Sequence, residues 1–318
     1  MENIEKLKEY LLTIYPIRKS SFQKEEFRKW LAGELRRSGW RSHEEHYGKF
    51  NGSVNMIAGD PDKATIFLCA HYDTPSRMLV PNFVSPTNVA AHVIYHFAAA
   101  MIMVILAVLV SFAVSFPLNQ PGLMLPLFII LALGLLWSSV YGPANRSNAN
   151  GNTSGVLALL AIAKALPHNK RVCLVFLDNN ERNLLGASAF RKKHPGAASN
   201  SLFFNFDCVG DGEHLLLMPS KLSRWDESLL SALNKAFSDE GTVHAKVLTQ
   251  GLVYYPSDHR KFKFHVAVCA CRRLAGLGYY IPRLRTKRDT VLSLDNITAI
   301  TEGIGRFVPL YLEETSGE

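Results

Sequence analysis

A histidine and an aspartate stand two residues apart at the end of an apolar run. Residues 65–70 read Thr-Ile-Phe-Leu-Cys-Ala, and His71, Tyr72 and Asp73 follow them. Such a run is typical of a buried strand, in which residues two apart point to the same side. A carboxylate beside an imidazole orients a histidine for metal binding or general-base catalysis. The pattern therefore predicts a catalytic or metal site here, with Asp73 orienting His71.

Further acidic residues come just after other strand-like runs. Glu181 follows the run 171–177, and Asp207 lies near the end of the run 201–208. The carboxyl ends of parallel strands meet at one edge of a sheet, where open α/β sheets hold their sites. We therefore expect Glu181 and Asp207 to lie near His71. Taken singly, each has a plainer structural explanation, because acidic residues commonly begin loops and cap helices.

The rest of the sequence alternates between helical and strand-like patterns. Helices are predicted at 2–15 and 21–39, the second with Ser21 as its N-cap, and strands at 41–49 and 54–58, joined by the turn 50–53. Later strands are predicted at 171–177, 201–208, 214–218, 242–248 and 264–271, and later helices at 154–166, 184–193, 225–238 and 295–312, the last with Asp295 as its N-cap. This alternation predicts an α/β layer fold with a mostly parallel central sheet.

Residues 89–141 interrupt this alternation and are almost free of charge. The runs 97–116 and 122–141 are each long enough to span a bilayer at about 1.5 Å per residue. Two buried core helices are the alternative, which the lack of a polar face on either run disfavours. We predict a transmembrane hairpin inserted into one soluble domain. That domain comprises residues 1–88 and 142–318.

Charge and cysteine usage predict where the soluble domain lies. The connection 117–121 has no Lys or Arg, whereas Arg77 and Arg146 flank the hairpin, so the domain should face the cytoplasm. Five cysteines in apolar runs favour buried thiols in a reducing compartment. The net charge of +8 comes without a zinc finger, an RNP motif or a long basic tract. The expected partner is therefore the lipid bilayer, and no nucleic acid is expected.

The order of motifs resembles the di-zinc aminopeptidases of metallopeptidase family twenty-eight. The blocks are Ser-Val-Asn-Met-Ile-Ala at 53–58, His-Tyr-Asp at 71–73, Gly-Asn-Thr-Ser-Gly at 151–155, Asn-Glu-Arg-Asn-Leu-Leu-Gly at 180–186, Asn-Phe-Asp-Cys-Val-Gly at 205–210, Ser-Asp-His at 257–259 and Arg-Thr-Lys-Arg-Asp-Thr at 285–290. The resemblance covers nearly all of the soluble sequence and implies a three-layer α/β/α zinc-exopeptidase domain. A hairpin insertion is not part of the typical member.

The resemblance also implies roles for individual residues. The family holds two zinc ions about 3.5–4 Å apart, and these activate a bridging hydroxide. His71 and Asp207 match ligands of the first zinc, and Glu181 matches a ligand of the second. Asp258 and His259 match a motif of the substrate pocket.

Three functional positions of the family are changed here. Gly151 stands where the family has the Asp that bridges both ions, and Asn180 stands where it has the general base. Arg285 stands where it has a His ligand, and a guanidinium cannot ligate a metal. The first zinc keeps two ligands, one fewer than the usual three of a catalytic site. We expect zinc at partial occupancy or absent, with Arg285 as a countercharge for Glu181.

Two functions remain open on the sequence alone. The first is a membrane-anchored pseudopeptidase that serves as a binding or regulatory module and holds a peptide or protein partner in its cleft. The second is an active membrane-bound metallopeptidase with a non-standard site, in which Asn150, Asn152 or Asp258 supplies a substitute ligand. His92 and His96 share one helix face at the start of the hairpin and form either an interfacial polar pair or a metal or proton site.

Overall fold

A nine-stranded sheet forms the centre of the computed structural model, which describes residues 2–48, 52–78, 80–237 and 242–314. Its strand order is β1-β2-β4-β3-β5-β8-β6-β7, and β9 pairs with β8. The strands are β1 (Ser42–Tyr47), β2 (Ser53–Ala58), β3 (Ile66–His71), β4 (Val172–Leu177), β5 (Leu202–Phe206), β6 (His214–Pro219), β7 (His244–Val247), β8 (Phe264–Leu274) and β9 (Gly278–Tyr280). Strands β4, β3, β5 and β8 run parallel, whereas β2 joins β4 and β6 joins β8 in antiparallel fashion. The predicted parallel arrangement thus holds for the centre of the sheet.

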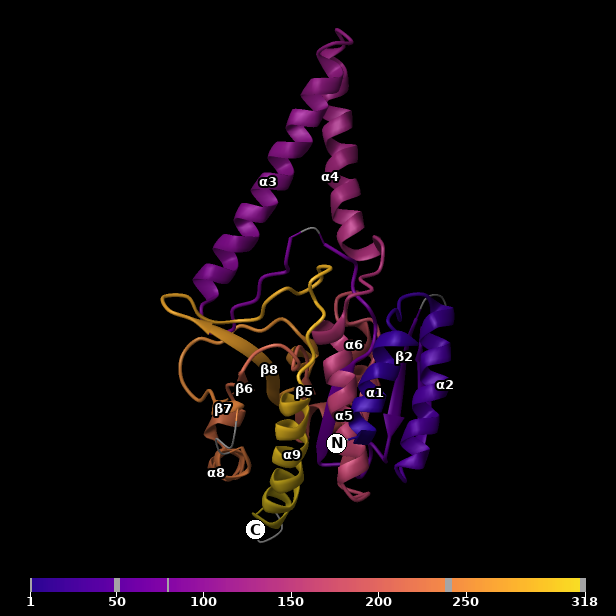
Figure 1. Ribbon diagram of the computed structural model, residues 1–318, viewed down its shortest axis with the longest axis vertical. Helices are drawn as coiled ribbons and strands as arrows, with labels where there is room; N and C mark the ends of the chain where they lie inside the picture. The colour runs from indigo at the N-terminus through magenta and orange to yellow at the C-terminus, as the bar shows by residue number, and fades with distance from the viewer. Residues whose placement is uncertain (1, 49–51, 79, 238–241, 315–318) are drawn as a thin grey trace.

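Helices cover both faces of this sheet (Figure 1). They are α1 (Glu2–Thr13), α2 (Ser21–Arg37), α5 (Ser154–Ala165), α6 (Leu185–Lys193), α7 (Pro195–Asn200), α8 (Glu227–Ala236) and α9 (Leu294–Glu314). Side chains of β3 alternate between the two faces, because Ile66 and Leu68 pack with α1, α2, α5, α8 and α9, whereas Phe67 and Cys69 pack with α6 and α7. The predicted three-layer α/β/α architecture is confirmed.

Several predicted boundaries need correction. Ser20, not Ser21, caps α2, because its Oγ accepts the N–H of Gln23 at 3.2 Å within a capping box. Asp295 lies inside the first turn of α9, where the Oγ of Ser293 accepts the N–H of Asn296 at 3.3 Å. Helix α7 and strand β9 were not predicted, since both are short. Part of the predicted turn 50–53 lies outside the described residues.

The charge-free segment forms two helices that extend away from the sheet (Figure 1). They are α3 (Val89–Ser115) and α4 (Met124–Tyr141), joined through the short helix Pro121–Leu123. Both are long and apolar enough to cross a membrane. No side chain of α4 is buried, so α4 is not a core helix of this domain.

Helix α3 begins earlier than residue 97, because its first turns pack on the domain. The rings of His92 and Tyr254 lie 5.1 Å apart, and the hydroxyl of Tyr95 donates to the carbonyl of Pro81 at 2.7 Å. The rings of His92 and His96 lie 4.5 Å apart. The domain boundaries at residues 88 and 142 remain predictions, although α3 and α4 begin and end next to them.

All five cysteines are free and buried, as expected from their apolar surroundings. Cys69 and Cys173 lie on neighbouring parallel strands, and Cys269 and Cys271 lie on β8. Burial raises the pKa of Cys69 well above its ordinary value. These thiols therefore serve as small apolar side chains in the core.

A buried ion pair fastens α2 to the end of β4. The Nζ of Lys24 lies 2.8 Å from Oδ1 of Asp178, and their side chains are 7% and 1% exposed. Asp178 also accepts the N–H of Val54 at 3.0 Å. Burial raises the pKa of Asp178, and the charge of Lys24 opposes this rise.

Replacing Lys24 should therefore destabilise the fold. Lys24→Met leaves the Asp178 carboxylate buried without its cation, which costs about 3–5 kcal/mol in such pairs. Denaturant unfolding of the full chain in mild detergent measures this loss. Lys29→Met is the matched control, because Lys29 pairs with Glu25 on the exposed surface of the same helix and its loss should leave the midpoint unchanged. Equal midpoints for both variants would contradict the role of Lys24.

Candidate functional site

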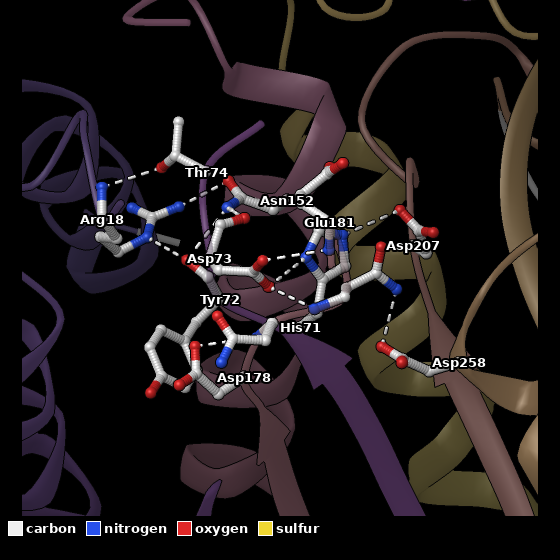
Figure 2. Close-up of polar contacts among 12 residues, drawn as sticks. Arg18, His71, Tyr72, Asp73, Thr74, Asn152, Asp178, Glu181, Asp207 and Asp258 are labelled. Atoms are coloured by element: carbon white, nitrogen blue, oxygen red, sulfur yellow. Dashed lines mark hydrogen bonds and ion pairs between the residues drawn. The ribbon is translucent and has the colours of Figure 1, made fainter. Parts of the chain in front are cut away.

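The carboxyl ends of β3, β4 and β5 bring the predicted residues together at the sheet edge nearest the hairpin (Figures 1 and 2). His71 ends β3 and pairs in register with Leu177 of β4, which places the loop after Leu177 beside it. A cavity of about 60 Å³ opens at this edge. Its lining includes His71, Asn180, Glu181, Asp207 and Arg285.

His71 lies between two carboxylates. Its Nδ1 is 3.3 Å from Oδ1 of Asp73, and its Nε2 is 3.6 Å from Oδ1 of Asp207. Burial alone would lower the pKa of His71, but the hydrogen bonds and charges of Asp207 and Asp73 outweigh it and raise the pKa well above its ordinary value. His71 is thus a cation in this arrangement, and Asp73 lies where it can orient the ring.

Both partner carboxylates are also held by other protein donors. Asp73 accepts the N–H groups of Asn180 at 2.9 Å and Glu181 at 3.1 Å, and Asp207 accepts the hydroxyl of Ser257 at 2.6 Å. Burial acts to raise the pKa of Asp73 and Asp207, yet the contacts with His71 lower both. Both groups are therefore ionised and largely satisfied by the chain itself.

Glu181 is paired with Arg285. The Nη2 of Arg285 donates to Oε2 of Glu181, and the two side chains are 28% and 13% exposed. Burial raises the pKa of Glu181, and the charge of Arg285 opposes the rise. Arg285 has a positive φ of 60°, so its backbone takes up the left-handed conformation that non-glycine residues seldom adopt. The guanidinium of Arg285 thus lies beside Glu181, as expected for a countercharge.

Asn180 contacts a second buried carboxyl group. Its Nδ2 donates to Oδ2 of Asp258 at 2.9 Å, and Oδ1 of Asp258 is buried without a hydrogen-bond partner among the described residues. Burial raises the pKa of Asp258 to about 7, although His71 and Asn180 oppose the rise. His259, predicted to share the substrate pocket, instead packs on Tyr255 and lines a separate cavity. The role of Asp258 and His259 in a substrate pocket stays a prediction.

The position of the family's bridging aspartate is filled by other groups. A Cβ added to Gly151 would lie 2.5 Å from Oδ1 of Asn148 and 3.1 Å from Oδ2 of Asp289. Asp289 accepts the N–H groups of Asn150 at 2.8 Å and Gly151 at 3.2 Å. Burial raises the pKa of Asp289 to about 7, against the effect of these two bonds. The backbone here therefore has little room for a larger side chain.

The amides considered as substitute ligands are engaged elsewhere. The Oδ1 of Asn150 accepts the N–H of Gly210 at 2.7 Å, and the Oδ1 of Asn152 accepts from Nη2 of Arg18 at 2.6 Å. Neither side chain lines the cavity at His71. Of the three proposed substitutes, only Asp258 keeps an unpartnered oxygen near the site.

Two supporting residues were not predicted from the sequence. Arg18 is fully buried and donates to the carbonyl of Tyr72 at 2.7 Å and to Asn152 (Figure 2). Burial lowers the pKa of Arg18 to about 10. Asp289 belongs to the matched block 285–290 but was given no role. Arg18 follows a predicted helix without any motif, so only the three-dimensional fold reveals it.

The residues present do not fit a two-metal centre. Glu181 is occupied by Arg285, and Gly151 supplies no bridging carboxylate. Across the described part of the chain, no three His, Cys, Asp or Glu side chains are grouped to hold a metal ion. The Nε2 of His71 and Oδ1 of Asp207, 3.6 Å apart, could at most contribute two ligands to a single ion.

Part of the chain is similar to a known protein family, and its fold is similar to those of solved structures. Residues 137–274 match the model of peptidase family M28. No curated protein sequence is a significant match. Among solved structures, a glutaminyl cyclase of Porphyromonas gingivalis has a TM-score of 0.60 at 16% identity, with 99% of this chain and 98% of that chain covered.

Solved structures of peptidases are also similar in fold to this chain. A Zn-dependent exopeptidase of Parabacteroides distasonis has a TM-score of 0.59 at 14% identity, with 97% of each chain covered. An aminopeptidase of Legionella pneumophila has a TM-score of 0.58 at 13% identity, with 97% of this chain and 71% of that chain covered. These likenesses establish the fold. The match over residues 137–274 shows that this part of the chain is similar to peptidase family M28.

Proposed function

We propose that this chain is a membrane-anchored member of peptidase family M28 that has lost peptidase catalysis and acts as a binding or regulatory module. The ion pair between Arg285 and Glu181 carries this proposal. A guanidinium beside Glu181 compensates the carboxylate that the family uses as a ligand of the second zinc. Asn180, at the general-base position, cannot accept a proton at neutral pH. The chain therefore lacks both the second ion and the base.

The module would meet its ligand close to a membrane. Helices α3 and α4 carry exposed apolar side chains along their length, and the bilayer is the partner that covers such surfaces. Arg77 and Arg146 flank the hairpin, so we propose that the domain faces the cytoplasm. Pro75, Asn82 and Val84, from the segment that leads into α3, line the cavity at His71. The small volume of this cavity suits one side chain of a peptide or protein partner.

An active metallopeptidase with a non-standard site is the second candidate. The separation of 3.6 Å between Nε2 of His71 and Oδ1 of Asp207 favours it, because two ligands of one ion lie about this far apart. Asp258, whose pKa is raised to about 7, would then be the group available to accept a proton. We favour the inactive module over the active metallopeptidase because Glu181 is paired with Arg285.

Metal content and hydrolysis separate the two candidates. For the full chain purified in mild detergent, we expect well under one zinc per chain by elemental analysis and no chelator-sensitive hydrolysis of aminoacyl substrates. Absence of a positioned base alone lowers rates about 10² to 10⁴-fold. Stoichiometric zinc with hydrolysis that His71→Ala abolishes would overturn the proposal. Lys170→Ala, on the exposed surface, is the control for purification effects.

The countercharge role of Arg285 predicts an interaction energy. In a double-mutant cycle of Glu181→Gln and Arg285→Gln, unfolding free energies should deviate from additivity by about 0.5–3 kcal/mol, as residues in contact do. Denaturant titration of the four proteins measures this. The exposed pair Lys29 and Glu25 provides a second cycle that should be close to additive. Strict additivity for Glu181 and Arg285 would refute the countercharge.

Membrane anchoring predicts resistance to alkaline extraction. The full chain should stay in the membrane pellet after a carbonate wash. Leu109→Asp combined with Leu133→Asp should move a large share to the supernatant, because an Asp at the centre of a spanning helix costs about 2.5–3.5 kcal/mol. Trp225→Asp alters an exposed apolar residue of the domain and should behave like the unchanged chain. Release of the unchanged chain by the wash would contradict anchoring.

A further inference from the structure

A second cavity lies apart from His71 and is surrounded by cationic residues. It has a volume of about 230 Å³ and lies between the end of β6, the segment 251–255 and the segment around His259. Lys221, Arg224 and Arg260 line it, together with His259 and His265. No aspartate or glutamate is among its lining residues in the described part of the chain. The cavity is therefore cationic without an internal counter-ion.

Two of the cations are held in place by the fold. Arg224 donates from Nε to the carbonyl of Pro219 at 3.2 Å and from Nη1 to the carbonyl of Gly251 at 3.1 Å. Its Nη2 has no hydrogen bond to any described residue. The guanidinium of Arg260 stacks on the ring of Tyr254 at 5.7 Å. Neither Arg224 nor Arg260 forms an ion pair with a described carboxylate, so both keep donors for a ligand.

His259 adds a buried polar group without a partner. It is 6% exposed, and its Nδ1 has no hydrogen-bond partner among the described residues. Burial lowers the pKa of His259 well below its ordinary value, and the neighbouring His265 and Arg260 lower it further. The ring is therefore neutral and retains one N–H. A buried polar atom without a partner is costly, so a ligand in this cavity would relieve that cost.

A neighbouring hollow extends the cationic surface. This hollow has a volume of about 350 Å³ and shares Arg260 with the first cavity. Arg191, Lys261 and Lys263 also line it, and none of its described lining residues is acidic. Arg260 therefore lies between two cavities of the same sign. Fixed guanidinium groups with an ammonium nearby are the donor set that recognises phosphate oxygens.

We propose that the cavity at Lys221, Arg224 and Arg260 binds a phosphate-type anion. Lys221, Arg224 and Arg260 all line this cavity, and its wall also contains His259, whose Nδ1 has no partner among the described residues. Tyr255 separates this cavity from the site at His71, since it lines both. The proposal is thus independent of whether the site at His71 is catalytic.

The anion could come from a soluble phosphate or from a lipid headgroup. Tyr254, in the cavity wall, contacts the first turn of α3, since its ring lies 5.1 Å from that of His92 and its N–H donates to the carbonyl of Pro86 at 2.9 Å. The cavity is therefore connected to the base of the hairpin. Both sources present the same chemistry, a phosphate group with oxygens free to accept hydrogen bonds.

Calorimetric titration of the full chain in mild detergent tests the proposal. Inorganic phosphate, inorganic pyrophosphate and mixed micelles doped with phosphatidic acid are the probes, at roughly 0.15 M salt so that diffuse surface attraction is screened. We expect saturable 1:1 binding of at least one probe. Lys221→Gln and Arg260→Gln should each weaken it at least tenfold. Lys170→Gln removes an exposed cation elsewhere and should leave it unchanged.

The pattern of responses identifies the source and can overturn the proposal. Binding of pyrophosphate or phosphate indicates a soluble ligand, and binding of phosphatidic acid micelles alone, over phosphatidylcholine micelles, indicates a headgroup. Both results support the site when Lys221→Gln and Arg260→Gln weaken them. The proposal is wrong if no probe binds saturably, or if Lys170→Gln weakens binding as much as the cavity variants do.

Discussion

Compensation of buried carboxylates by cations of the chain itself is the constraint on which this structure depends. A carboxylate taken out of water is costly unless a cation or several donors face it. Asp178 has Lys24, Asp73 and Asp207 have His71, and Glu181 has Arg285. Hydrolases of this kind give part of that task to bound ions. Here cations of the chain face these carboxylates.

Gly151, which stands where the family resemblance implies a bridging aspartate, is closely surrounded by other side chains. An aspartate at Gly151 would need the space that Asn148 and Asp289 occupy, and its carboxylate would lie beside that of Asp289. Asp289 in turn holds the N–H groups of Asn150 and Gly151. A carboxylate at this position would therefore require the side chains of Asn148 and Asp289 to shift.

The sequence predicts the α/β/α layers and the sheet edge that carries the site, because both follow from local patterns of apolar and polar residues. Apolar runs ending in polar residues predicted where β3, β4 and β5 would end, and parallel pairing then placed His71 near Glu181 and Asp207. It missed Arg18 and Asp289, because their roles depend on contacts between segments far apart in the chain. Asp258 and His259 are neighbours in a 3₁₀ turn, and Asp258 contacts Asn180 whereas His259 packs on Tyr255.

The end of α4 contacts the loop that carries Glu181 and the segment before α2. The Nζ of Lys19 donates to the carbonyl of Gly142 at 2.8 Å and that of Val140 at 3.1 Å, so a cation satisfies the C-terminal end of α4. The guanidinium of Arg182 lies 5.4 Å from the ring centre of Tyr141, at the same end. Arg182 directly follows Glu181, so the loop that carries Glu181 also touches the hairpin. The ion pair between Glu181 and Arg285 therefore lies one residue along the chain from a contact with α4.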